Sequence, residues 1–249
     1  MGLRAIVRPP ARTYPRALTR LVPPPPVDMA LALEQHHAYV EALRACGVQV
    51  IELPPDDAHP DSVFVQDPVL VVAGRAVVLR AAEASRAGEA EALAGVLRDY
   101  LPVVEMGPPA TLDGGDVLVA EGRLFVGLST RSNLQGCDQV AALTGSPVVA
   151  VPLPEGLLHL LSGCTYLGHN RLLVTPSLAP CLPAFEKVLV PDAEAPAANV
   201  LVLQEHAIVP AGYPRVAALV AGCGFSVHAV PASEFEKRDG GVTCRALLF

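Results

Sequence analysis

Two side chains in this 249-residue sequence could perform nucleophilic catalysis, a cysteine near the C-terminus and a histidine in an apolar run. Cys244 ends the segment Asp-Gly-Gly-Val-Thr-Cys, whose paired glycines allow a tight turn and close backbone approach. It is either a reactive thiol held at the mouth of a site or a small buried hydrophobe. His159 lies between two Leu-Leu pairs. It is either a core histidine bonded to the backbone or a proton shuttle whose pKa is tuned by burial.

Several carboxylates could assist such a pair. Asp113 and Asp116 flank two glycines, a pattern typical of a β-turn and equally able to bind a cation or orient a histidine. Asp61 fits a solvated loop. Asp67 follows an apolar run, where a carboxylate needs a partner because burying an unpaired charge is costly.

Two arginines, Arg86 and Arg131, open segments with helical character. An exposed arginine is the ordinary interpretation of each. Their alternative function is to clamp a substrate carboxylate with the guanidinium fork.

The composition excludes several classes of protein. The net charge is −7 and no Lys/Arg run occurs, which argues against nucleic acid as a partner. No apolar stretch reaches the roughly 18 residues that span a bilayer, and the N-terminus lacks the apolar core of a signal peptide. We therefore expect a cytoplasmic protein without a membrane partner, whose six scattered cysteines stay reduced. The cysteines and histidines show no metal-ligand spacing, so no metal site is predicted.

Four segments have the pattern of a β-hairpin, in which two short apolar runs flank a polar turn. The paired runs are 69–72 with 76–79, 117–119 with 124–126, 165–167 with 172–174, and 200–203 with 207–209. Helical candidates follow at 85–100, 131–143, 180–187 and 214–221, and further β runs at 103–104, 148–151, 188–190 and 225–230. The sequence thus predicts four copies of a hairpin–helix–strand unit.

The two ends of the chain can supply a fifth unit. Segments 3–7 and 246–249 are strand-like, and 28–45 is an amphipathic helix with Asp28 as N-cap and Gly47 just beyond its end. Residues 48–53 supply its strand. Pairing the first and last strands would close the units into a ring without open edges. We find no linker, and therefore predict a single α/β domain over residues 1–249 with a site at the centre of the ring.

Taken in order, these segments resemble the dimethylarginine dimethylaminohydrolases, especially the bacterial form. The matching segments are 32–36, 60–67, 112–116, 127–133, 159–160, 210–215 and 239–244, which together extend over nearly the whole chain. The family belongs to the guanidine-modifying superfamily with arginine deiminases and amidinotransferases. The resemblance implies a five-bladed α/β propeller of ββαβ units, consistent with the five repeats closed by the terminal strands.

The resemblance also implies a role for each candidate residue. Cys244 is the implied nucleophile, His159 the general acid/base, and Asp113 the carboxylate that positions the histidine and the substrate. The implied substrate-binding residues are Leu18 in a mobile lid, Asp61, Gln66 and Asp67 at the guanidinium, Arg86 and Arg131 at the amino-acid carboxylate, and Arg238 through its backbone.

The implied reaction is hydrolysis of asymmetric dimethylarginine and monomethylarginine to citrulline and dimethylamine or methylamine. Cys244 attacks the guanidinium carbon, a covalent thiouronium-type intermediate forms, and His159 protonates the leaving amine and then activates water. No cofactor is required. The expected partner is a small-molecule substrate, and a homodimer is expected because dimers are common in the family.

One position departs from the family pattern. Gln66 stands where the family usually has glutamate, so an acceptor is kept and a negative charge is lost. We expect weaker attraction for a cationic guanidinium, or altered specificity.

Two other functions stay open on the sequence. The first is a deiminase or a hydrolase of another substituted guanidine. The deiminase branch usually carries His-x-Asp, and here Leu161 occupies the acidic position. The second is a non-catalytic amino-acid-binding homologue, in which Cys244 would resist alkylation.

Overall fold

The computed structural model describes residues 2–249, which fall into two compact units. Unit 1 comprises Met1–Gln66 and Val200–Phe249, and unit 2 comprises Asp67–Asn199. Within the described residues the strands form five three-stranded sheets, two in unit 1 and three in unit 2. The single domain expected from the sequence stays a prediction.

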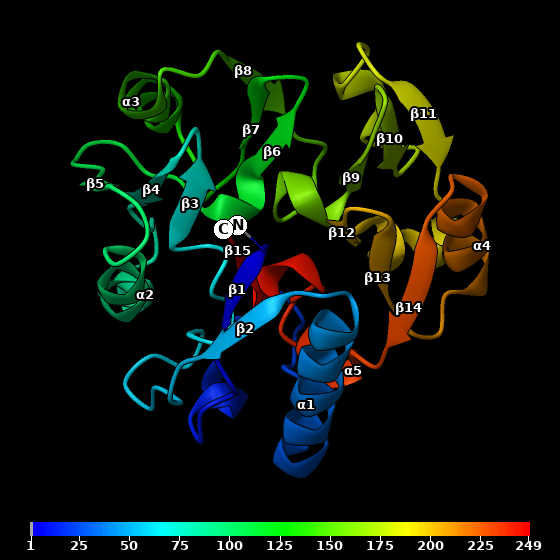
Figure 1. The fold of residues 1–249 in the computed structure, drawn as a ribbon, viewed down its shortest axis with the longest axis horizontal. Coiled ribbons are helices and arrows are strands. Elements are labelled where there is room, and N and C mark those ends of the chain that lie inside the picture. The colour runs from blue at the N-terminus through cyan, green and yellow to red at the C-terminus, as the bar shows by residue number, and fades with distance from the viewer. Residues whose placement is uncertain (1) are drawn as a thin grey trace. The chain divides into compact units, whose positions relative to one another are not determined.

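Unit 2 repeats one topology three times. In each of its sheets an antiparallel hairpin is followed by a third strand that pairs in parallel with the second strand of the hairpin. The sheets, which run from cyan to yellow in Figure 1, are β3 (Val69–Val72), β4 (Arg75–Val78) and β5 (Val103–Glu105); β6 (Val117–Ala120), β7 (Arg123–Leu128) and β8 (Val148–Pro152); and β9 (Cys164–Gly168), β10 (Arg171–Val174) and β11 (Glu186–Leu189). The helices α2 (Ala90–Leu97) and α3 (Leu134–Thr144) connect the strands of the first two sheets.

Unit 1 contains the same topology once continuously and once across the two chain ends. The continuous sheet is β12 (Leu201–Leu203), β13 (His206–Pro210) and β14 (Ser226–Val230), with α4 (Pro214–Gly222) between its last two strands. In the other sheet β1 (Arg4–Val7) pairs in parallel with β2 (Gln49–Glu52) across α1 (Met29–Ala45), and antiparallel with β15 (Leu247–Leu248). Arg4 and Phe249 exchange backbone hydrogen bonds of 2.8 and 2.9 Å, which confirms the predicted pairing of the terminal strands.

Local turn chemistry explains why the hairpins could be predicted. The two-residue turns at Ala73-Gly74 and Glu121-Gly122 have positive φ at both positions, from 48° to 72°. Such turns match the twist of the flanking strands and favour glycine at the second position. All four predicted hairpins are confirmed.

The helix predictions had a mixed outcome. Asp28 caps α1 as predicted, accepting hydrogen bonds from the amides of Ala30 and Leu31 at 2.9 and 3.1 Å, and α4 covers the predicted residues 214–221. The helix expected at 180–187 is wrong: Ala179–Cys181 forms a single 3₁₀ turn, and β11 begins at Glu186. Pro183 lies in this segment, and proline cannot donate a helical hydrogen bond.

Each unit has its own hydrophobic clusters. In unit 1, Tyr39 and Leu43 of α1 pack against Ile208 and Val230, all 3% exposed or less. Burying such side chains contributes about 1.5–3 kcal/mol each, which fixes α1 on the strands. In unit 2, one cluster packs around Leu112 and Val126 and another around Leu160 and Leu172, so the loops before β6 and β9 are anchored by buried leucines. No helix within residues 2–249 is long and apolar enough to cross a membrane.

Candidate active site

His159 is the candidate acid/base of unit 2. It immediately precedes the 3₁₀ turn Leu160–Ser162, while Asp113 precedes the 3₁₀ turn Gly114–Asp116. Both residues are buried, and His159 Nε2 lies 3.3 Å from Asp113 Oδ2. The predicted carboxylate–histidine pair is therefore present within one unit.

Buried carboxylates dominate the electrostatics of this histidine. Burial alone lowers the pKa of His159, but the close contact with Asp113 and the charges of Asp67, Asp116 and Asp113 outweigh it, so the pKa lies above its ordinary value. A larger fraction of His159 is then protonated near neutral pH than for an exposed histidine. Such a group can donate a proton to a leaving amine.

Asp116 holds the loops that carry His159 and Asp113. Its Oδ2 accepts hydrogen bonds from the hydroxyls of Ser129 and Ser132 at 2.5 and 2.6 Å, and its Oδ1 accepts from the Leu160 amide at 3.0 Å. Ser132 Oγ also accepts from the Asp113 amide at 3.2 Å. Burial raises the pKa of Asp116 despite these donors and His159. The sequence singled out Asp116 only as a second acid, and its two serine partners were missed.

Arg86 forms buried ion pairs with two carboxylates, those of Asp67 and Glu89. Arg86 donates to Asp67 at 2.7 Å and to Glu89 at 2.7, 3.0 and 3.2 Å, and the Gly115 amide donates to Asp67 Oδ1 at 3.1 Å. Burial by itself would raise the pKa of Asp67. The positive charge of Arg86, followed by that of His159, outweighs burial and holds the pKa of Asp67 below its ordinary value. Asp67 thus has the partner that its apolar sequence context required. Glu89 was not foreseen.

Arg131 lies within reach of the same cluster. Its guanidinium is 3.8 Å from Asp113 Oδ2 and 3.5 Å from Glu83, and its side chain is 13% exposed. Its backbone amide is fixed by Ser129 Oγ at 2.9 Å. This partial exposure leaves the guanidinium accessible to an anionic ligand. Arg86, by contrast, is only 6% exposed and already forms ion pairs with Asp67 and Glu89. A substrate carboxylate bound there would be the third carboxylate around this guanidinium.

Replacing Asp113 by asparagine is expected to lower the pKa of His159, because the nearest negative charge is removed while the shape is kept. The raised pKa of His159 also affects the stability of the fold. Below pH 6.5, the ordinary pKa of histidine, the protonated ring contributes its full stabilisation, and this contribution is lost as the pH rises through the pKa of the folded state. NMR titration of His159 measures the shift, with exposed Asp138→Asn as the matched control. An unchanged His159 pKa in Asp113→Asn would contradict the assignment.

Cys244 is the candidate nucleophile and lies in unit 1. It lies in the 3₁₀ turn Thr243–Arg245, is half-buried, and its Sγ accepts a hydrogen bond from the Gly241 amide at 3.4 Å. An amide donor aimed at sulfur favours the thiolate form. The paired glycines matter for a further reason, because a Cβ on Gly240 would lie 2.2 Å from the Phe64 ring. The turn that carries Cys244 therefore requires glycine at that position.

The unit that holds Cys244 also holds four of the predicted substrate-binding residues, Gln66, Asp61, Leu18 and Arg238. The backbone N–H of Gln66 donates to the backbone carbonyl of Cys244 at 3.2 Å, which ties Gln66 to the turn that carries the cysteine. Asp61 is 4% exposed, and its Oδ1 accepts from the Leu18 amide at 3.1 Å. A buried carboxylate thus holds the segment that the sequence assigned to a lid.

Arg238 fixes the neighbouring part of the N-terminal segment. Its guanidinium donates to the carbonyls of Pro15 and Pro25 at 2.7 and 3.0 Å. The adjacent Asp239 accepts from the Arg20 amide at 2.7 Å. The side chain of Arg238 therefore has a structural role, and its predicted contact with substrate through the backbone stays a prediction.

Arg245 was missed by the sequence reasoning. It is fully buried, with its guanidinium carbon 4.1 Å from the Tyr39 ring centre and 4.3 Å from that of Phe235. Its three guanidinium nitrogens have no hydrogen-bond partner among residues 2–249. A buried cation held by aromatic faces directly follows the candidate nucleophile, and only its position beside Cys244 could have drawn attention to it.

Comparison with known proteins identifies related chains. The family model "N,N dimethylarginine dimethylhydrolase, eukaryotic" matches residues 27–177. The N(G),N(G)-dimethylarginine dimethylaminohydrolase of Pseudomonas aeruginosa is 39% identical over 98% of each chain. The enzyme of the same name from Streptomyces coelicolor is 39% identical over 97% of this chain and 95% of its own.

A solved structure extends the similarity to three dimensions. The Pseudomonas aeruginosa enzyme, as a cysteine-to-serine mutant complexed with citrulline, matches with a TM-score of 0.95 and 38% identity over 100% of both chains. Together with the five three-stranded sheets, this match confirms the predicted fold class, an α/β propeller of five repeated units closed by the terminal strands.

Proposed function

The chain belongs to the dimethylarginine dimethylaminohydrolase family, and from this premise we propose that it hydrolyses N-omega-methylated arginines to citrulline and dimethylamine or methylamine. The observation that carries the proposal is the near full-length similarity to the Pseudomonas aeruginosa enzyme, whose solved structure holds citrulline. The chemistry of the chain's own residues agrees with it, since a thiol beside an amide donor and a histidine among carboxylates are what covalent hydrolysis of a guanidinium needs.

Cys244 is the proposed nucleophile. Its thiolate adds to the guanidinium carbon, and the Gly241 amide helps to stabilise the negative sulfur before attack. The bond from the central carbon to the methylated nitrogen then breaks. The departing amine takes a proton, and an S-alkylthiouronium linked to Cys244 remains.

His159 is the proposed proton donor and acceptor. Its raised pKa supplies the proton for the leaving amine, after which the neutral ring removes a proton from water. Hydroxide adds to the thiouronium carbon, the carbon–sulfur bond breaks, the added hydroxyl gives up its proton to water, and citrulline leaves with the thiolate regenerated. Asp113 is the proposed group that orients His159 and stabilises its protonated form.

The remaining predicted residues are proposed to bind the substrate. Asp61 and Asp67 orient the guanidinium with Gln66 beside them, and Arg131 holds the amino-acid carboxylate together with Arg86. Leu18 covers the substrate and Arg238 contacts it through its backbone. The buried carboxylates of Asp61 and Asp67 support the first role, and the partly exposed guanidinium of Arg131 supports the second.

The test is incubation of the full chain with asymmetric dimethylarginine, monomethylarginine and arginine, with citrulline and the released amine quantified by mass spectrometry. Citrulline with dimethylamine or methylamine is expected, and Cys244→Ser should abolish both. Cys181→Ser makes the same chemical change at another half-buried cysteine and should leave turnover unchanged. His159→Asn should also lose turnover, because both the proton for the leaving amine and the base that activates water are removed.

The outcomes separate the alternatives. Citrulline from unmodified arginine alone would assign the chain to deiminase chemistry. If the wild type is inactive and Gln66→Glu turns over methylated arginines, the missing charge at position 66 sets the specificity. Inactivity of both on all three substrates would overturn the proposal.

We also propose that the enzyme works in the cytoplasm as a homodimer. All six cysteines are free thiols, which supports a reducing compartment. Light scattering coupled to size exclusion tests the assembly, and a monomeric mass at working concentration would contradict it.

A further inference from the structure

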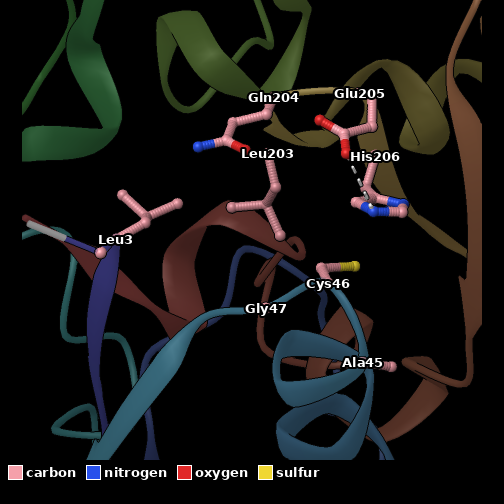
Figure 2. A pocket seen from close by; sticks show the side chains of 9 residues that line it. Leu3, Ala45, Cys46, Gly47, Leu203, Gln204, Glu205 and His206 are labelled. Carbon is pink, nitrogen blue, oxygen red and sulfur yellow. Dashed lines mark ion pairs between the residues drawn. The ribbon is translucent and has the colours of Figure 1, made fainter.

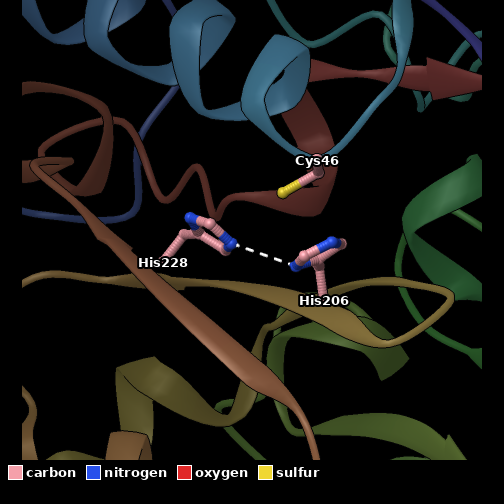
Figure 3. Close-up of side chains that lie close together, drawn as sticks. All are labelled: Cys46, His206 and His228. Carbon is pink, nitrogen blue, oxygen red and sulfur yellow. Dashed lines mark hydrogen bonds between the residues drawn. The ribbon is translucent and has the colours of Figure 1, made fainter.

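Three side chains of the metal-binding type lie together in unit 1. They are Cys46, the C-cap residue of α1, His206, the first residue of β13, and His228, in the middle of β14. The sulfur and one ring nitrogen from each histidine lie within 4.8 Å of one another. In Figure 3 the sulfur of Cys46 points toward the space between the two rings. None of the three has a role in the proposed reaction.

The fold dictates this convergence. In the parallel pair of β13 and β14, His206 is opposite Ser226 and Ile208 is opposite His228. The two histidines are therefore diagonal neighbours two positions apart, with side chains on the same face of the sheet. The helix α1 packs on that sheet through Tyr39 and Leu43, so its last turn brings Cys46 over the histidine pair.

The distances fit a tetrahedral zinc ion. With Zn–N of about 2.0–2.1 Å and Zn–S of about 2.3 Å, tetrahedral geometry separates two nitrogen ligands by about 3.3 Å and a sulfur from a nitrogen by about 3.6 Å. His228 Nε2 and His206 Nδ1 are 3.2 Å apart. The sulfur lies within 4.8 Å of each nitrogen, so a shift of no more than about 1.2 Å brings it to the separation that zinc requires. Cys46 is half-buried at the C-cap of α1, just beyond the last helical residue Ala45.

The charges around the cluster also suit a cation. Glu205 Oε1 lies 3.8 Å from His206 Nε2, on the opposite side of the ring from Nδ1. A carboxylate there favours the tautomer with a proton on Nε2 and a lone pair on Nδ1, as outer carboxylates do for metal-bound histidines. The C-terminal end of α1 adds the negative end of a helix dipole. The charges of a Cys46 thiolate, a divalent cation and the Glu205 carboxylate would sum to zero.

The cluster is accessible from solvent. Cys46 and His206 line an opening of about 370 Å³, with Leu3, Gly47 and Glu205 among the other lining residues. Figure 2 shows the side chains of Cys46 and His206 on the same side of this opening. An ion can enter here, and a water molecule can complete its coordination.

We propose that Cys46, His206 and His228 form a binding site for Zn²⁺, a second functional site in addition to the proposed active site. A thiolate and two imidazoles are borderline-soft ligands that select zinc over calcium or magnesium. Binding replaces the thiol proton of Cys46 with the metal and breaks the hydrogen bond between the two rings. The ion then links the end of α1 to β13 and β14.

The experiment measures zinc affinity of the full chain by competition with a chromogenic chelator. The background is Cys244→Ser, because the catalytic thiol could itself bind a soft metal. One equivalent of Zn²⁺ should bind, and a second series with Co²⁺ should show a thiolate-to-cobalt charge-transfer band. Cys46→Ser or His228→Ala should weaken binding by at least about tenfold, and Cys46→Ser should remove the band.

Matched controls separate this site from general thiol or imidazole binding. Cys181→Ser and His169→Asn change a cysteine and a histidine of unit 2 and should leave affinity unchanged. Far-UV circular dichroism checks folding, and Cys46→Ala or His228→Gln replaces any variant that fails to fold. Absence of zinc binding by Cys244→Ser, or binding unaffected by both Cys46 and His228 substitutions, would overturn the proposal. Affinity should rise with pH, because the thiol proton of Cys46 must leave when the metal binds.

Discussion

Replacing Gly115 by alanine is expected to reduce turnover of methylated arginine by about 100-fold or more while the chain stays folded. An ideal Cβ at this position would lie 2.7 Å from His159 Nδ1 and 2.9 Å from Asp67 Oδ1. Contacts this short do not persist, so the histidine ring or the carboxylate must move. Both groups are buried and tied to their neighbours, and a displacement of about 1 Å at a reacting group costs roughly this factor.

The measurement compares kcat and KM of Gly115→Ala with those of Gly95→Ala. Gly95 lies inside α2, and a Cβ added there would have no neighbouring atom within 4 Å, so alanine should keep activity and favour the helix. Thermal unfolding of both variants shows whether overpacking has cost stability, for which about 1–3 kcal/mol is expected at position 115. Full activity of Gly115→Ala would show that His159 does not need its observed position.

Replacing Arg245 by methionine is expected to slow the reaction of Cys244 with alkylating agents by about 10- to 100-fold at neutral pH, equivalent to a rise of about 1–2 in the thiol pKa. Arg245 follows Cys244 in the same turn, and the two groups interact electrostatically. Removing a buried cation beside a thiolate removes a reason for the thiol to ionise.

In Arg245→Met the thermal stability of the protein is not expected to fall together with the reactivity of Cys244. Burial lowers the pKa of Arg245, which shows that its environment disfavours the charge, although Tyr39, Tyr14, Cys244 and Glu236 partly offset this. Its guanidinium nitrogens lack hydrogen-bond partners within residues 2–249, so an apolar side chain of similar length should cost little stability or raise it. We therefore expect Arg245→Met to lose turnover without a lower melting temperature.

The pH dependence of alkylation, followed on the Cys244 peptide by mass spectrometry, gives the thiol pKa directly. Arg245→Lys keeps a charge but loses the flat guanidinium that stacks on Tyr39 and Phe235, and should fall between wild type and Arg245→Met. Identical pH profiles for wild type and Arg245→Met would show that the buried cation does not act on the nucleophile.

Local sequence signals accounted for the elements that local chemistry determines. Hairpins such as the one turning at Glu121-Gly122 were predicted because two adjacent residues set the turn. The cap of α1 by Asp28 depends on amides only two and three residues away. The segment 180–187 was misassigned because helical composition was weighed without the interruption by Pro183 and the pairing of β10 with β11.

Partners that come from distant segments could not be predicted from local patterns. The Asp116 network joins Ser129, Ser132 and the Leu160 amide, and these residues meet only after β6, β7 and the loop before β9 have folded. The same holds for Cys46 with His206 and His228, whose separation of about 160 residues and more hides any ligand spacing. For these residues the signal resides in strand register and helix packing, which a single sequence does not display.

The division of the chain into its two units has a consequence for synthesis on the ribosome. Unit 2 is one continuous stretch, Asp67–Asn199, and can fold while later residues are still being made. Unit 1 is discontinuous, and its sheet of β2, β1 and β15 needs the last few residues of the chain. Cys244 lies in the part of unit 1 that follows unit 2 in the sequence, and its carbonyl accepts a hydrogen bond from the backbone N–H of Gln66 in the part that precedes unit 2. The turn that carries the candidate thiol is therefore completed only when segments from both sides of unit 2 have come together.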